Sequence, residues 1–246
     1  MFHHLLPHAW SSSAERLAIA AAVTLAFAAL ARAVRGVNPS GAVAGGVACF
    51  LLFTGAGPAA FVTLASLFAM TWLSTRLGYR RKLARGLAER REGRSAWQVL
   101  ANLSVAAAAT VVFSSTGHRI WLVATVAAMA EAATDTVASE IGQYRSADAR
   151  FLTTWKKVPA GTDGGITLAG SLAGLAAGIA ITAVASAGGL LIASEFWIPV
   201  AAGLAGMLLD SLLGATLQRR GSISNQTVNL ISTLAAAALA YTISAL

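Results

Sequence analysis

The sequence predicts an all-α, polytopic bundle of about eight transmembrane helices with short cytoplasmic loops, forming a single domain over residues 1–246. The composition is 57% hydrophobic and only 11% charged, whereas a soluble domain carries about 25% charged residues. The hydrophobic residues also form long segments, and about 20 apolar residues are enough to span a bilayer. We therefore expect an integral membrane protein, located in the inner membrane if the source is prokaryotic.

The apolar segments are rich in Ala and Gly, as closely packed membrane helices tend to be. Gly170, Gly174 and Gly178 recur at a spacing of four, which predicts close approach of a second helix. Arg32 and Arg35 follow the first segment, whereas a signal peptide carries its positive charge in front, so we expect an uncleaved helix. The segments cover residues 17–33, 40–56, 58–76, 96–115, 119–142, 165–192, 196–217 and 224–244.

The basic residues predict the orientation of these helices. Residues 32–38, 76–95, 143–163 and 218–223 contain sixteen of the eighteen Lys and Arg residues. Because short loops rich in Lys and Arg stay in the cytoplasm, both termini are expected outside and these four loops inside. The same charges can attract anionic lipids. We therefore expect membrane lipids, and no nucleic acid, as partners of the basic loops.

Acidic residues interrupt two of the apolar segments. Glu131, Asp135 and Ser139 follow one another at a spacing of four, on one face of the segment 119–142. Asp210 lies in the segment 196–217, at a depth similar to that of Asp135. An acid near the bilayer centre costs about 2.5–3.5 kcal/mol on insertion scales, so such residues normally have a function or a partner. One or two carboxylates together with phosphate oxygens are what Mg²⁺ prefers.

Three of the segments that run in the opposite direction have polar starts on the expected cytoplasmic side. Their starts contain Asn38-Pro39-Ser40, the run from Pro159 to Thr167, and the run from Ser222 to Asn229. The start of a helix offers free N–H groups and a partial positive charge that suit phosphate. Glycines in the second run would let the backbone approach a ligand. Acids and phosphate-binding groups would thus meet on one side of the membrane.

Structural alternatives remain open for each of these features. Asn38 and Ser40 could be a plain helix cap, and residues 161–165 could be only a tight turn. Asp135 or Asp210 could be a buried hydrogen-bonding group or a proton carrier. Glu131 could link two helices by hydrogen bonds, and so could Gln98 and Asn102. The joint placement of these groups on one side and at one depth favours a functional site.

Several of these motifs resemble the integral membrane family of plant phytyl-phosphate kinase, which includes the animal transmembrane protein nineteen. The resemblance covers about residues 30–235, in order. It is carried by the motifs Asn38-Pro-Ser-Gly-Ala42, Gly93-Arg94 with Gln98-Val-Leu-Ala-Asn102, Ala130-Glu131 to Gly142, Val158 to Thr167, and Asp210-Ser211 to Gln218.

The resemblance implies an enzyme, a prenyl-phosphate kinase. It would transfer a phosphoryl group from a nucleoside triphosphate, with CTP favoured, to an isoprenoid (phytyl-type) monophosphate at the cytoplasmic face, giving the diphosphate. Asp135 and Asp210 would bind Mg²⁺, with Glu131 and Glu140 as further acids, and Lys82 or Lys156 would neutralise charge. The predicted phosphate-binding residues are Asn38, Ser40, Gly161, Thr162, Asp163, Gly164, Gly165, Asn225 and Asn229. A transporter of a phosphorylated lipid or small anion is the alternative, because broken helices and midplane acids also mark transporters.

Overall fold

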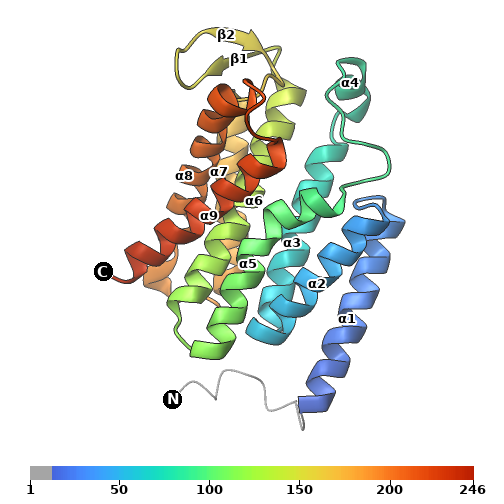
Figure 1. The fold of residues 1–246 in the computed structure, drawn as a ribbon, viewed down its shortest axis with the longest axis vertical. Coiled ribbons are helices and arrows are strands. Elements are labelled where there is room, and N and C mark those ends of the chain that lie inside the picture. Colours follow the sequence, from blue (N-terminus) through green and yellow to red (C-terminus); the bar gives the residue numbers. More distant parts are fainter. Residues whose placement is uncertain (1–12) are drawn as a thin grey trace.

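The computed structural model describes residues 13–246 and confirms the all-α transmembrane architecture (Figure 1). Within this described part, eight helices are long and apolar enough to cross a membrane. Each coincides with one of the predicted segments. They are α1 (Ser13–Ala33), α2 (Pro39–Ala56), α3 (Pro58–Arg76), α5 (Ala96–Thr116), α6 (Ile120–Arg145), α7 (Leu168–Ala187), α8 (Trp197–Leu213) and α9 (Asn225–Ser244).

Local sequence signals set the helix boundaries. The side chain of Asn38 accepts a hydrogen bond from the amide of Gly41, and Pro39 occupies the first helical position of α2. Thr167 caps α7 and Ser224 caps α9 in the same way. These side chains satisfy amide groups that have no partner inside the helix. The caps therefore fix where α2, α7 and α9 begin.

Helix α6 is the centre of the bundle. It packs against α3, α5, α7, α8 and α9, and its residues 122–134 are buried without interruption. Small residues permit this packing: a Cβ atom on Gly174 of α7 would lie 2.5 Å from the carbonyl oxygen of Thr134, and one on Gly203 of α8 would lie 3.1 Å from the amide nitrogen of Glu131. The predicted close approach at the four-residue glycine repeat is therefore confirmed, and α6 is its partner.

The basic loops gather at one end of the bundle, which we call the basic end (Figure 1). The short helix α4 (Tyr79–Ala84) lies in the loop after α3. The loop after α6 forms a small antiparallel sheet of β1 (Asp148–Phe151), β2 (Lys157–Pro159) and β3 (Gly165–Ile166), in the order β2-β1-β3. Val37 and Arg94 form an isolated bridge between the α1–α2 turn and the loop before α5.

Candidate functional site

A polar cavity of about 370 Å³ lies at the basic end, between α5, α6, α7, α8 and α9. Carboxylates, amides and hydroxyls form most of its wall, in contrast to the aliphatic packing deeper in the bundle. Among the described residues, five acids and one base line it, namely Glu89, Asp135, Glu140, Asp163, Asp210 and Arg94. The polar motifs on one side of the membrane domain thus converge on one space.

Asp135 of α6 and Asp210 of α8 both line this cavity, in agreement with the similar depth read from the sequence. Each carboxylate is within electrostatic range of the other, and Ser232 on α9, whose hydroxyl donates to the Asn229 carbonyl (3.0 Å), lies near the carboxylate of Asp210. Asp163, in the loop before α7, is also within electrostatic range of Asp210. The Oδ2 atom of Asp210 is buried and has no hydrogen-bond partner among the described residues. This oxygen is available for a ligand.

Arg94 brings a positive charge to the acids. Gly93 before it has a φ of +87°, in the left-handed region, and a Cβ there would lie 2.6 Å from the amide nitrogen of Val37. Backbone hydrogen bonds of 3.0 Å from the Arg94 amide to the Gly36 carbonyl and from the Asn38 amide to the Arg94 carbonyl fix the loop. The Arg94 guanidinium lies within electrostatic range of Asp135. It makes no side-chain hydrogen bond within residues 13–246.

A chain of amides connects α5 to α9 along the cavity wall. The Gln98 side chain accepts a hydrogen bond from the Ser95 amide (2.9 Å) and donates one to the Glu89 carboxylate (3.1 Å). Asn102 donates to the Gln98 carbonyl (2.8 Å) and accepts from Asn229 at 3.4 Å. Asn102 therefore links α5 to α9, as the structural alternative held, whereas Gln98 attaches the start of α5 to the loop before it. Both residues also line the cavity.

Residues 161–165 line the cavity as part of a loop that precedes α7. The glycines were expected to open this helix, but α7 begins at Leu168 with Thr167 as its cap. The difference arises because Gly165 pairs with β1 in the small sheet. Gly164 has a φ of +75°, and a Cβ there would collide with the backbone of Ala215. This glycine lets the loop pack against the end of α8.

The end of α8 is itself irregular. Residues Gly214–Gln218 form a π-helical turn, a feature often found at functional sites. A Cβ on Gly214 would lie 2.8 Å from the Gly164 amide nitrogen, so the turn and the loop fit closely. Gln218 then lines the cavity, beside Asn225 and Gln226 at the start of α9.

Lys82 and Glu140 form a buried ion pair at the edge of the cavity. The Lys82 side chain is 0% exposed and also donates to the carbonyls of Ser74 (3.1 Å) and Thr75 (2.8 Å). Glu140 accepts a second hydrogen bond from the Thr75 hydroxyl (3.1 Å). All three protons of the lysine ammonium group therefore have acceptors. Glu140 lines the cavity, whereas Lys82 lies behind it and fixes its position.

Glu131 does not line the cavity. It is buried one turn before Asp135, where a Cβ on Gly206 of α8 would lie 2.5 Å from its Cγ atom. Ser232 on α9 lies near the Glu131 carboxylate, and the Oε1 atom of Glu131 has no hydrogen-bond partner in residues 13–246. Glu131 therefore joins α6, α8 and α9, behind the predicted metal ligands.

Three further predicted residues lie outside the cavity wall. Asn38 accepts hydrogen bonds from Ser40 (2.9 Å) and the Gly41 amide, and Ser40 accepts one from the Ala96 amide (3.2 Å). Their observed role is to cap α2 and to attach the start of α5. Lys156 is exposed between β1 and β2. The predicted residues that do line the cavity are Asp135, Glu140, Gly161, Thr162, Asp163, Gly164, Gly165, Asp210, Asn225 and Asn229.

Sequence reasoning missed Arg94 and Glu89 as site residues. Both lie in a loop with eight Lys and Arg residues, so nothing in its composition distinguishes them. The Gly93-Arg94 pair in the family motif was the one available signal. Further polar residues in the wall are Thr136, Ser139, Gln143, Thr167, Ser171, Ser211, Gln218 and Gln226.

The donor set fits a divalent cation that is held jointly with phosphate. Among residues 13–246, no group of three or more His, Cys, Asp or Glu side chains is placed to hold a metal alone. Mg²⁺ binds instead through one or two carboxylates, water and substrate phosphates. Asp135 and Asp210, with the unpaired Oδ2 atom, provide such a pair. A cavity with five acids and one arginine also needs added positive charge before it can hold phosphates.

Comparison with known proteins places the chain in a family. It is 31% identical to the uncharacterized membrane protein MJ0933 of Methanocaldococcus jannaschii, over 89% of this chain and 90% of that protein. It is 30% identical to the uncharacterized membrane protein sll0875 of Synechocystis sp., over 79% of this chain and 78% of that protein. Protein VTE6, chloroplastic, of Arabidopsis thaliana is 30% identical over 81% of this chain and 62% of its own length.

No solved structure matches the chain. The model of a family described as integral membrane protein DUF92 matches residues 22–237. This match and the relatives confirm the family resemblance identified from the motifs. The chain belongs to this integral membrane protein family, DUF92.

Proposed function

We propose that this protein transfers a phosphoryl group from a nucleoside triphosphate, with CTP favoured, to an isoprenoid monophosphate at the basic end of the bundle. The observation that carries the proposal is the meeting of Asp135, Asp210 and Arg94 in one polar cavity of a membrane domain. Membership of the family that the phytyl-phosphate kinase motifs identify supports a reaction of this type. The choice of an isoprenoid as acceptor and of CTP as donor belongs to this proposal.

The reaction needs positioning and charge neutralisation more than covalent chemistry by the protein. An oxygen of the acceptor monophosphate attacks the γ-phosphorus, the bond from this phosphorus to the bridging oxygen breaks, and the nucleoside diphosphate leaves. Mg²⁺, when bound, would neutralise charge on the phosphate oxygens. Asp135 and Asp210 are the residues that would hold it.

The other residues of the cavity bind and orient the phosphates. Arg94, whose guanidinium has no side-chain hydrogen bond within the described chain, can form two parallel hydrogen bonds to one phosphate group. The side-chain amide of Asn229, which also lines the cavity, supplies a neutral donor. The cavity lies at the basic end of the bundle, where a water-soluble nucleotide and a membrane-embedded tail can meet.

A transporter is the alternative, and the buried carboxylate of Glu131 is the observation that favours it, since midplane acids can carry protons. Against it, the residues of α6 before Glu131 are packed in the main apolar core with α3, α5, α7 and α9. A phosphorylated molecule would have to cross this core. The polar groups of the cavity lie at the basic end alone.

The test uses purified protein in sealed vesicles, given Mg²⁺, either CTP or ATP, and a set of prenyl monophosphates. We expect diphosphate to form with at least one pair, and no product from the Asp135→Asn protein. Accumulation of a prenyl phosphate or small phosphate inside the vesicles, without any diphosphate, would establish the transporter instead.

A further inference from the structure

A second pocket, with an apolar wall and a volume of about 100 Å³, lies between α1, α2, α3 and α5. Phe27, Leu64, Phe68 and Leu103 contribute large apolar side chains. Gly45 on α2 also faces it, and a Cβ there would meet only Val99, at 3.8 Å. Because Gly45 has no side chain, this part of the pocket stays open.

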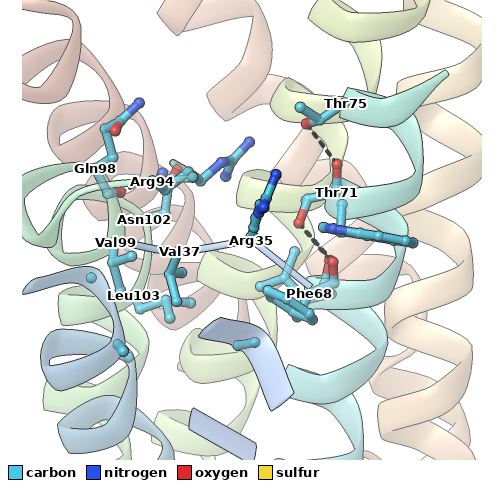
Figure 2. A pocket seen from close by; sticks show the side chains of 18 of the residues that line it. Arg35, Val37, Phe68, Thr71, Thr75, Arg94, Gln98, Val99, Asn102 and Leu103 are labelled. Atoms are coloured by element: carbon cyan, nitrogen blue, oxygen red, sulfur yellow. Dashed lines mark hydrogen bonds between the residues drawn. The ribbon is translucent and has the colours of Figure 1, made fainter. Parts of the chain in front are cut away.

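Arginines gather at one end of this pocket. Arg35 and Arg94 reach the same end, while Phe68 and Leu103 lie at the other (Figure 2). Neither guanidinium has a hydrogen bond or ion-pair partner within residues 13–246. Arg76 also lines the pocket but is held by the carbonyls of Val34 (3.0 Å) and Arg35 (3.2 Å). Two guanidinium groups without hydrogen bonds in the described chain, beside an apolar pocket, suit an amphiphile with an anionic head.

The pocket adjoins the polar cavity. Glu89, Arg94, Gln98 and Asn102 line both spaces, so they form a shared wall. A molecule in the apolar pocket with its head at Arg94 would therefore present that head to Asp135, which lies within electrostatic range of this arginine. Along the two spaces, the apolar wall comes first, then the arginines and then the acids. In the proposed reaction these would contact the isoprenoid tail, its monophosphate and the nucleotide, in the same order.

We propose that the apolar pocket is the tail site for the isoprenoid monophosphate, with its phosphate held between Arg35 and Arg94. This inference rests on the proposed function for the identity of the ligand. The narrow space between four helices suits the first part of one chain, and the rest of the tail lies in the bilayer. A glycerophospholipid, which carries two chains on a glycerol, is the competing occupant, and the test distinguishes it from a single-chain ligand.

Binding without nucleotide tests the site independently of catalysis. The probe is phytyl monophosphate with a diazirine on its tail, added to the protein in lipid nanodiscs and crosslinked by light. Mass spectrometry should find the crosslinks in residues 41–46 and 64–68. Crosslinks confined to other helices would overturn the proposal. Equal displacement of the probe by phosphatidic acid and by phytyl monophosphate would also overturn it.

Two matched pairs of variants test the tail and the head of the ligand. Gly45→Leu fills the pocket and should weaken binding by more than tenfold, whereas Val47→Phe adds bulk on the exposed side of the same helix and should change it less than twofold. Gly45→Ala, which has room for its Cβ, should lie between the two. Wild-type binding by a folded Gly45→Leu protein would contradict the tail site.

Arg35 has a φ of +55°, so asparagine, which tolerates this conformation, is the suitable neutral replacement. Arg35→Asn should weaken binding about tenfold, equal to about 1.4 kcal/mol. Arg32→Gln removes a charge from the same end of α1 outside the pocket and should have less than a twofold effect. Equal effects of the two changes would contradict the head site. If the pocket is labelled but no diphosphate forms, the tail site holds and the kinase proposal falls. If diphosphate forms but the pocket is not labelled, the kinase proposal holds and the tail site is wrong.

Discussion

Replacing Lys82 with methionine tests whether this lysine holds the cavity wall. The change removes the ion pair with Glu140 and two hydrogen bonds, to the carbonyls of Ser74 and Thr75. It leaves the Glu140 carboxylate, whose side chain is only 13% exposed, without its cation. Removing one partner of a buried ion pair costs about 3–5 kcal/mol. We expect the free energy of unfolding to fall by that amount.

Unfolding in mixed detergent micelles, followed by circular dichroism, measures this loss. Lys157→Met is the matched control, because the Lys157–Asp148 pair is 3.9 Å apart with side chains 67% and 65% exposed. An exposed pair contributes less than about 1 kcal/mol. A loss for Lys82→Met as small as that of the control would refute the reasoning. Adding Glu140→Gln to Lys82→Met should restore part of the stability, because the uncompensated charge is gone.

The remaining predictions concern the site and the topology. Asp135→Asn and Asp210→Asn should each lower Mg²⁺-dependent diphosphate formation at least about 100-fold with unchanged unfolding, since they remove charge where phosphates must be held; activity near wild type in either would exclude a shared metal site. Gly164→Val should destabilise the loop before α7 and speed its proteolysis, because its Cβ meets the backbone of Ala215; wild-type proteolysis rates would refute this contact. Gly165→Val should have a smaller effect, because its Cβ lies 3.1 Å from the Ala149 methyl group and 3.0 Å from a carbonyl. In intact cells, the cysteine of Ala88→Cys should not react with a membrane-impermeant thiol reagent. Rapid labelling from outside would show that the orientation is opposite to the predicted one.

The sequence predicted the fold well because every membrane helix is a separate apolar segment. Pro39, Pro58 and Gly117 mark boundaries that α2, α3 and α5 keep. The small sheet was not predicted, since its strands have four, three and two residues. Strands of this length leave no alternating pattern to recognise.

The site could be predicted where helix geometry fixes position, and not where a loop does. Asp135 and Asp210 meet because two helices of the same direction carry them at the same depth. Lys82 and Arg94 come from one basic loop, and their places depend on two glycines with positive φ, Gly78 and Gly93. Lys82 points inward to Glu140, whereas Arg94 points into the cavity. Their spacing in the sequence does not encode that difference.

The two halves of the bundle differ in how freely their sequences can change. Around α6, glycines such as Gly174 and Gly206 leave no room for a larger side chain, which keeps α7, α8 and the two aspartates in fixed positions. Helix α1 instead packs chiefly on α2, and residues such as Leu25 are 70% exposed. Substitutions on α1 that face the apolar pocket, such as at Phe27, can therefore reshape this pocket without displacing the acids. Among related proteins, preference for different hydrocarbon chains could diverge in this half while the other half stays constant.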